Sequence, residues 1–370
     1  SLIERLEKVF STLDRMERWK GHLYNWYDTR NLEVLNPRYV SSVDSGNFIG
    51  YLIVLKSGLE ELKNQPVLSG TQIQGLTDTI KLANIDVIME NIKTPYQWRQ
   101  MLNHLSQKIL NESMPWIDIE WSNLLDNMCE DFLKDIDMLE LQAEMEYIPS
   151  IGELAEKGNS SAKELIARID KLINNINSWV QETDFKPLFD KRRNLFRVGY
   201  NVSMNMPDNS YYDLMASEAR LASFIAIAKG DVNQRHWFRL GRPLSIIHGI
   251  ATLLSWSGTM FEYLLPNLVM VVYAGTIIKQ SCEAVVKRQI KYGKVRGIPW
   301  GISESAYYHF DQNLNYQYRA FGVPGLGLRS DLRKSLVIAP YASIMAISTA
   351  PREVYKNIKF LQSIEAEGKY

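Results

Sequence analysis

The stretch Trp300-Gly-Ile-Ser-Glu304-Ser-Ala-Tyr-Tyr308 places one carboxylate among aromatic side chains, directly after the turn Arg296-Gly-Ile-Pro299. Aromatic faces can stack on the apolar faces of pyranose rings. A carboxyl group in a partly dry pocket has a raised pKa and can act as an acid. Two further stretches, Tyr211–Arg220 and Trp256–Tyr263, also combine acidic with aromatic residues. Together the three stretches predict a carbohydrate site in the second half of the chain.

The composition is that of an ordinary globular protein. The chain has 370 residues, of which 46% are hydrophobic and 23% charged, and this is enough apolar material for one large domain or two smaller ones. Its formal net charge is +0, whereas nucleic-acid binders normally carry a basic excess. We therefore expect no nucleic-acid partner.

The spacing of cysteines and histidines argues against a metal site. Cys129 and Cys282 lie far apart and form neither a disulfide framework nor a metal-binding pair, although a single disulfide between them remains an alternative. The five histidines show no HxxxH or HxH spacing. We expect a reducing compartment, no metal and no cofactor.

Helical periodicity extends through most of the chain. Apolar residues recur on one face of an opening helix from Leu2, and the ranges 161–180, 214–228 and 282–292 show the same pattern. The best strand-like run is 196–202. Because the chain opens on a charged amphipathic segment, we expect no signal peptide.

One nearly uncharged run, 243–278, has the composition of a membrane span but contains His248, Glu262 and Pro266. Its cleanest apolar piece, 263–278, is shorter than the ~20 residues that a spanning helix requires. We therefore interpret the run as two buried helices that line the interior of the domain.

Many helices of moderate length with short connections predict an all-α protein. The carbohydrate-site stretches then favour an α/α toroid over a bundle, because the inner helices of a toroid present their ends around one central carbohydrate-binding cleft. We expect one functional domain, with an N-terminal helical part at 1–190 and a motif-rich catalytic part of the same barrel at 191–370.

Eight motifs carry a resemblance to a known family. They are His22-Leu-Tyr-Asn-Trp-Tyr-Asp28, Val40-Ser-Ser-Val-Asp44-Ser-Gly46, Ser217-Glu-Ala-Arg-Leu-Ala222, Trp237-Phe-Arg-Leu-Gly-Arg242, Ser255-Trp-Ser-Gly-Thr-Met-Phe-Glu-Tyr263, Gly297-Ile-Pro-Trp-Gly-Ile-Ser-Glu-Ser305, Tyr316-Gln-Tyr-Arg-Ala-Phe-Gly-Val-Pro-Gly325 and Ile338-Ala-Pro-Tyr341. In this order, and over essentially the whole chain, they resemble the central glucoamylase-like region of cyclic β-1,2-glucan synthases. Eight long motifs in the same order do not arise by chance.

The resemblance implies an (α/α)6-barrel domain, related to β-1,2-glucanases, that closes linear β-1,2-glucan into a ring by transglycosylation. It implies flanking domains in the same polypeptide: a glycosyltransferase that elongates the glucan and a phosphorylase-like domain that trims it. The segment is then expected to be cytoplasmic, as part of a larger inner-membrane protein. Because the family pattern continues beyond Tyr370, we expect this chain to lack the final barrel segment, which would leave the barrel open.

Ring closure breaks one β-1,2 bond and makes another, so the product keeps the β configuration. Two inversions through a covalent glycosyl-enzyme intermediate give this outcome, and they require a nucleophile and an acid/base about 5–5.5 Å apart. We assign Glu304 as the acid/base because its aromatic surroundings are expected to raise its pKa. The alternative places Glu304 in the first turn of a helix that begins near Ser303.

Glu218 is assigned as the nucleophile, because the nearby Arg220 is expected to keep a carboxylate ionised. The alternative for Glu218 is a salt bridge at the surface or between helices. Glu262 lies in an otherwise uncharged segment and needs a partner. We expect it either to bind sugar hydroxyls or to pair with a buried arginine such as Arg239 or Arg319.

The remaining predicted substrate-binding residues fall into three groups. Tyr212 and Asp213 are both predicted to bind substrate. Asp213 is expected to bind a hydroxyl or to cap a helix. The stacking group, for which core packing is the alternative, comprises Trp256, Tyr263, Trp300, Tyr307, Tyr308, Tyr316 and Tyr318. The arginine group is expected to contact hydroxyls or to hold the carboxylates, and it comprises Arg220, Arg239, Arg242 and Arg319.

Four residues receive structural interpretations. His236 and His309 are expected to be satisfied structural histidines. Asp28 and Asp44 are expected to be loop and helix-cap residues that shape one edge of the cleft.

Other functions compete with ring closure. A β-1,2-glucan hydrolase would share the fold, and would differ in how far water is excluded from the intermediate. A non-catalytic glucan-binding scaffold needs no clustered acids, so Glu218, Glu262 and Glu304 argue against it. Exo-acting glucoamylase chemistry on α-glucans rests only on shared architecture, which is a weak basis.

Overall fold

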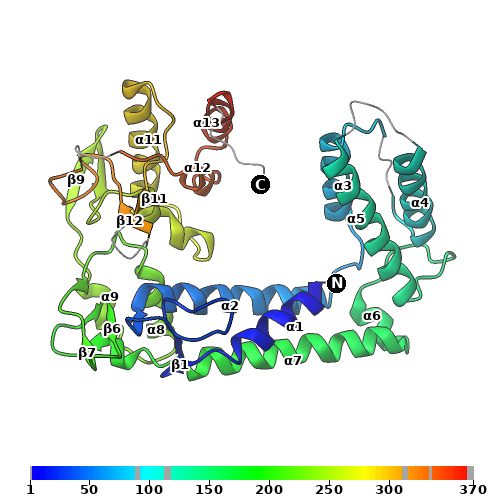
Figure 1. The fold of residues 1–370 in the computed structure, drawn as a ribbon, viewed down its shortest axis with the longest axis horizontal. Coiled ribbons are helices and arrows are strands. Elements are labelled where there is room, and N and C mark those ends of the chain that lie inside the picture. The colour runs from blue at the N-terminus through cyan, green and yellow to red at the C-terminus, as the bar shows by residue number, and fades with distance from the viewer. Residues whose placement is uncertain (1, 88–91, 112–117, 311–315, 333–335, 365–370) are drawn as a thin grey trace. The chain divides into compact units, whose positions relative to one another are not determined.

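The computed structural model describes residues 2–87, 92–111, 118–310, 316–332 and 336–364, and the side chains of 307–310, 316 and 317 lie outside this description. The chain divides into two compact units (Figure 1). Unit 1 comprises Ser1–Arg15 and Ile53–Ser178, and unit 2 comprises Met16–Leu52 and Trp179–Tyr370. The expected division at residue 190 into two parts of one barrel stays a prediction.

Unit 1 is built from helices. Its elements are α1 (Leu2–Leu13), the second half of α2 (Ser42–Leu62), α3 (Gly70–Leu82), α4 (Pro95–Asn111), α5 (Ile119–Met138), α6 (Ile151–Glu156) and most of α7 (Ser160–Glu182). Helix α5 packs against α3 and α4, and the rings of Trp98 and Phe132 meet edge to face with centroids 5.9 Å apart. The helices expected from Leu2 onward and over 161–180 are confirmed.

Unit 2 combines short strands with helices. Its elements are β1 (Arg18–Trp19), β2 (His22–Leu23), β3 (Tyr39–Ser41), the first half of α2, η1 (Lys186–Leu188), β4 (Phe189–Asp190), β5 (Leu195–Arg197), β6 (Gly199–Asn201), β7 (Met206–Pro207), β8 (Tyr211–Tyr212), α8 (Arg220–Ala228), α9 (Arg235–Arg239), β9 (Leu244–Ile247), β10 (Ile250–Leu253), α10 (Met260–Leu264), η2 (Leu265–Leu268), α11 (Ile277–Arg296), β11 (Glu304–Phe310), β12 (Tyr316–Ala320), α12 (Pro340–Met345) and α13 (Pro351–Ser363).

The strands of the described chain form five small antiparallel sheets: β1-β2, β9-β10, β11-β12, β3-β6-β7 and β4-β5-β8. The expected predominance of helix is confirmed, and so is the strand-like run 196–202, which supplies most of β5 and β6. The all-α prediction was incomplete, because these sheets are present in unit 2. The closed (α/α)6 ring stays a prediction, since the described residues show no closed barrel.

The core of unit 2 forms around α10 and α11. Met260, Val285 and Leu326 are wholly buried there. Helix α11 extends beyond the expected range 282–292 to Arg296, and the next residue, Gly297, has a φ of 66° and forms the left-handed C-terminal cap that glycine adopts without strain. Among the described helices, none is both long and apolar enough to cross a membrane.

The expectation of two buried helices over 243–278 is wrong. Strands β9 and β10 form a hairpin there, followed by the short helices α10 and η2. The hairpin turns at His248 and Gly249, which both have positive φ, 50° and 79°, as a tight two-residue hairpin requires. A short apolar run without clear periodicity does not distinguish a strand from a buried helix.

Helices α2 and α8 approach closely at a glycine. A Cβ atom added at Gly46 would lie 2.2 Å from Cβ and 2.4 Å from Cα of Ala222. One turn further along α2, Gly50 lies against Leu221 and Ile225 of α8. This contact joins the N-terminal end of α2 to the segment around α8, and these are two of the elements that surround the candidate site.

We predict opposite effects for two glycine substitutions in α2. Gly46→Ala forces a methyl group into backbone atoms of α8 and should lower the free energy of unfolding by about 2 kcal/mol or more. Gly58→Ala, in the same helix with open space around its Cβ position, should raise it by about 0.5–1 kcal/mol. Denaturant unfolding of both variants measures the effects, and equal stability of the two would contradict the close approach.

Candidate active site

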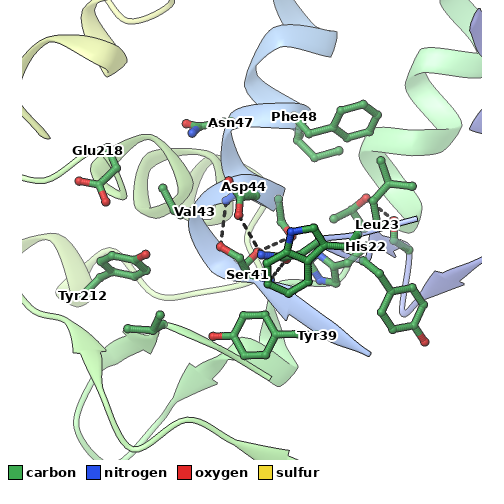
Figure 2. A pocket seen from close by; sticks show the side chains of 18 of the residues that line it. His22, Leu23, Tyr39, Ser41, Val43, Asp44, Asn47, Phe48, Tyr212 and Glu218 are labelled. Atoms are coloured by element: carbon green, nitrogen blue, oxygen red, sulfur yellow. Dashed lines mark hydrogen bonds between the residues drawn. The ribbon is translucent and has the colours of Figure 1, made fainter. Parts of the chain in front are cut away.

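A cavity of about 610 Å³ lies within unit 2. The chain segments that line it are distant in sequence: the residues between 21 and 26, those between 39 and 49, and single residues that include Tyr212, Glu218, Glu304 and Tyr318. Figure 2 shows Asp44 and Asn47 projecting from α2, with Glu218 and Tyr212 supplied by other segments. The cavity thus brings the two predicted catalytic carboxylates, 304 − 218 = 86 residues apart, to one space.

Glu218 lies in a turn directly before α8. The helix expected over 214–228 begins only at Arg220, because the backbone of Leu214 forms a β-bridge with Gly241. The Glu218 side chain is buried, and the Ser217 hydroxyl donates a hydrogen bond of 3.2 Å to its carboxylate. Burial raises the pKa of Glu218 to about 8, and the charges of the nearby glutamates act in the same direction.

Arg220 does not hold Glu218 ionised, contrary to expectation. Its guanidinium donates to the backbone carbonyls of Glu262, at 3.1 Å, and Tyr263, at 2.7 Å, and to Asn267 Oδ1 at 2.8 Å. Among the ion pairs of the described residues, none joins Arg220 to Glu218. Arg220 therefore holds the α10 segment in place through these hydrogen bonds, and the pKa of Glu218 stays raised by burial.

Glu304 is the first residue of β11, so the alternative of a helix beginning near Ser303 is wrong. Tyr318, on the paired strand β12, donates a hydrogen bond of 2.6 Å to Glu304 Oε2. The Tyr341 hydroxyl donates to the backbone carbonyl of Glu304, also at 2.6 Å. Burial raises the pKa of Glu304 to about 7, although the Tyr318 hydrogen bond favours the ionised form.

Glu262 neither pairs with an arginine nor faces the cavity in the described structure. It occupies the third position of α10, where it forms a capping box with Thr259. Its carboxylate accepts hydrogen bonds from Ser255 Oγ at 2.8 Å, from the Ser257 amide at 2.9 Å and from the Thr259 amide at 2.8 Å. This carboxylate fixes the 255–259 loop. Burial still raises its pKa, against the lowering effect of these donors.

The other predicted arginines also act elsewhere. Arg239 is exposed on α9, and Arg242 donates to the Trp237 carbonyl at 2.8 Å near the end of that helix. Arg319 pairs with Asp331 at 2.8 Å. In the described part of the chain, none of the three arginines lines the cavity with the carboxylates. The sequence did not reveal whether the side chain of each arginine points toward the cavity or away from it.

Two predicted stacking residues belong to the core. Tyr263 is 1% exposed, and its hydroxyl contacts the carbonyls of Leu253 and Leu326 at 2.8 and 2.7 Å. Trp300 is 6% exposed and packs in the same core cluster. Neither ring offers a free face to a sugar.

The remaining aromatic predictions have different outcomes. Trp256 is 46% exposed, and its indole N–H donates to Asp213 at 2.8 Å, so Asp213 orients a ring at the surface. Tyr212 and Tyr318 line the cavity. The side chains of three other predicted stacking residues lie outside the described part of the chain: Tyr307, Tyr308 and Tyr316.

His236 is a satisfied structural histidine, as expected. Its ring nitrogens lie 2.9 Å from the Asn194 carbonyl and 2.8 Å from the Ser223 hydroxyl. The side chain of His309 lies outside the described residues. Both cysteines are free and buried. The described residues contain no cluster of three or more histidine, cysteine, aspartate or glutamate side chains that could hold a metal ion.

The sequence interpretation missed most of the wall contributed by the N-terminal part of unit 2. His22, Trp26, Asn47 and Phe48 line the cavity. The motifs at 22–28 and 40–46 pointed to these segments, although only Asp28 and Asp44 were singled out from them. Asp44 lies in the first turn of α2 and lines the cavity, as expected, whereas Asp28 pairs with Arg30 in a loop.

The raised pKa of Glu218 predicts a pH-dependent stability. The folded protein retains this proton up to a pH of about 8, whereas the unfolded chain loses it near the ordinary value of 4.5. The free energy of unfolding should therefore fall as the pH rises from about 5 to 8.

Thermal unfolding of Glu218→Gln should show a weaker decline over this range and a higher Tm at pH 8 than the unsubstituted protein. Glu61→Gln, at an exposed position in unit 1, is the matched control and should leave the slope unchanged. A slope that Glu218→Gln does not alter would contradict the burial of this carboxylate.

Comparison with known proteins agrees with the motif resemblance. Residues 210–370 match the family Glycoamylase, described as "Putative glucoamylase". The whole chain aligns over 394 residues, at 38% identity, with the cyclic beta-(1,2)-glucan synthase NdvB of Rhizobium meliloti (strain 1021). The chain spans 14% of that much longer protein.

Two solved structures of glucoamylase-like proteins also align with the chain. One, from Bacteroides caccae ATCC 43185, is 13% identical with a TM-score of 0.40, and the alignment covers 97% of this chain and 84% of that one. The other, from Bacteroides fragilis NCTC 9343, is 16% identical with a TM-score of 0.38, over 98% and 80% of the two chains. At these scores the likeness decides nothing about the arrangement of this chain.

The evidence for a relationship over the full chain is the 38% sequence identity to the glucan synthase. The resemblance inferred from the eight motifs is thereby confirmed: the chain is homologous over its whole length to a segment of a cyclic β-(1,2)-glucan synthase, and its residues 210–370 match the glucoamylase-like family model.

Proposed function

We propose that this chain is a glycoside-hydrolase-type transglycosylase that closes linear β-1,2-glucan into rings and retains the configuration at the anomeric carbon. The observation that carries the proposal is the pair of buried carboxylates, Glu218 and Glu304, that line one cavity and both have raised pKa values. Two carboxylates with distinct environments are the minimum that retaining chemistry needs. The substrate is inferred from the relative's name.

We further propose catalytic roles that reverse the assignment made from sequence. Glu218 is buried, which raises its pKa, and its carboxylate accepts only one side-chain hydrogen bond, at 3.2 Å, so its protonated form is favoured and it suits the acid/base. Glu304 accepts a short hydrogen bond from Tyr318, which stabilises its ionised form and suits a nucleophile. The sequence assignment rested on Arg220, whose guanidinium contacts other oxygens.

In the first step, the Glu304 carboxylate attacks the anomeric carbon of one glucose unit, and Glu218 donates its proton to the departing 2-oxygen. The glycosidic bond breaks, and a covalent α-linked glycosyl-enzyme forms. In the second step, the 2-hydroxyl at the non-reducing end of the same glucan attacks this carbon from the β face and gives its proton to Glu218. One β-1,2 bond is lost and one is made, so neither a metal nor an activated sugar is required.

The length of the relative bears on the partners. Because the chain corresponds to 14% of a much longer protein, we propose that it acts beside further domains of the same polypeptide, a glycosyltransferase that supplies linear glucan and a phosphorylase-like domain that trims it. A cytoplasmic location as part of an inner-membrane protein stays a prediction.

The proposal predicts the products formed from linear β-1,2-glucan. Mass spectrometry should detect glucans lighter than the linear ones by one water, while a reducing-end assay shows no rise. New reducing ends with only linear products would make the protein a β-1,2-glucanase. Unchanged glucan, in a protein that nevertheless binds it, would support a binding scaffold. Glu218→Gln and Glu304→Gln should each lower the rate by about 10³-fold, the scale expected for loss of a catalytic acid or nucleophile.

Azide separates the two catalytic roles. With an aryl β-glycoside, whose leaving group needs no protonation, azide should restore turnover to both alanine variants. Glu304→Ala should yield the α-glycosyl azide, because azide replaces the nucleophile. Glu218→Ala should yield the β-glycosyl azide, because azide attacks the intermediate. The opposite pairing of variants and anomers would restore the sequence-based assignment.

A further inference from the structure

Two polar atoms of the cavity are unusual because they are buried without a hydrogen-bond partner. They are His22 Nδ1 and Asn47 Oδ1, and no described residue donates to either of them. Both residues line the cavity. A buried acceptor without a donor costs about 1–3 kcal/mol, so such atoms require an explanation.

The chemistry of His22 fixes what its free nitrogen can do. Its other nitrogen, Nε2, lies 2.7 Å from the carbonyl oxygen of Asp184, which can only accept, so Nε2 carries the hydrogen. The ring is 1% exposed, and this burial lowers the pKa of His22 to about 4. The imidazole is therefore neutral at ordinary pH, and Nδ1 presents a lone pair that accepts a hydrogen bond.

Asn47 lies one turn into α2, three residues after Asp44 and on the same face of the helix. Figure 2 shows both side chains projecting from α2, with no dashed line from the amide of Asn47 to any residue drawn. The carboxylate of Asp44 already accepts a hydrogen bond, because Asn25 Nδ2 donates to it at 3.4 Å. Unlike that carboxylate, the Asn47 carbonyl has an unused acceptor position in the described structure.

The surroundings of these atoms define the ligand chemistry. The two free atoms are acceptors, and the neighbouring Asp44 is a carboxylate, so an anion is disfavoured and a neutral hydrogen-bond donor fits. Trp26 also lines the cavity and is 47% exposed, so the same cavity has an aromatic side chain that is not covered by the core. Several hydroxyl donors together with an apolar ring face are the combination that a pyranose presents.

We propose that this N-terminal wall, defined by His22, Trp26, Asp44 and Asn47, is a glucosyl-binding subsite in which sugar hydroxyls donate to His22 Nδ1 and Asn47 Oδ1. The inference rests on the proposed function, since it assumes a β-1,2-glucan as the ligand. It adds a binding surface supplied by the part of unit 2 that precedes both catalytic carboxylates in the sequence.

Asn47→Leu tests the subsite, because it replaces the amide by an apolar group of similar size. Loss of a sugar hydrogen bond should weaken binding of linear β-1,2-gluco-oligosaccharides about tenfold. Removal of a buried polar group without a partner should leave the Tm unchanged or raise it. Binding is measured calorimetrically in the Glu304→Gln background, in which the substrate is not turned over, and Tm by thermal unfolding.

Asn64→Leu, at an exposed asparagine outside the cavity, is the control and should change neither binding nor Tm. Asn47→Ala, which removes the amide without adding bulk, should weaken binding to a similar extent.

Unchanged affinity of both Asn47 variants, with normal binding by the parent, would overturn the subsite and leave the proposed function intact. Weaker binding with a Tm lowered in both variants would make Asn47 a structural residue and would also overturn it. If the Glu304→Gln protein itself binds no β-1,2-glucan, the subsite fails, and the product assay decides separately whether the proposed function fails with it.

Discussion

The burial of three carboxylates in unit 2 is the constraint on which the rest of the site depends. A desolvated carboxylate is costly unless donors or cations offset the loss of water. Glu262 accepts from Ser255, Ser257 and Thr259 and fixes a loop, Glu304 accepts from the Tyr318 hydroxyl, and Glu218 accepts from the Ser217 hydroxyl at 3.2 Å and from its own backbone amide. The carboxylate with the most donors, Glu262, lies outside the cavity lining, whereas Glu218 and Glu304, with fewer donors, line the cavity.

The cavity exists because distant segments of unit 2 meet. The absence of a side chain at Gly46 lets α2 approach α8, and this places Asp44 and Asn47 on the same cavity as Glu218. The β11-β12 pair contributes Glu304 together with the tyrosine that bonds it. The same assembly leaves polar atoms of His22 and Asn47 unsatisfied, and such a cost is typical of sites that are shaped for a ligand rather than for stability.

Several features were accessible from sequence because they depend on local patterns. Helical periodicity predicted the helical majority, and the acidic-aromatic stretches identified Glu218 and Glu304 as residues of one site. The prediction for the run 243–278 was wrong, because a short apolar hairpin and a buried helix have similar composition. The feature that distinguishes the hairpin is the pair of positive-φ residues at its turn. The prediction that Tyr263 and Trp300 stack on sugar was wrong, because an aromatic motif does not reveal whether the ring is buried in the core.

Local sequence patterns were enough to predict a mainly helical chain and to reveal a family resemblance through eight motifs in order. The packing of unit 2 was needed to show which acids line one cavity, which oxygens Arg220 contacts, and which hydroxyl groups donate to each carboxylate. These outcomes depend on interactions between residues far apart in the chain, such as the charge of Glu304, which helps to raise the pKa of Glu218. A pKa responds to burial and to neighbouring charges in space, so the different surroundings of two glutamates with similar local sequence appear only after folding.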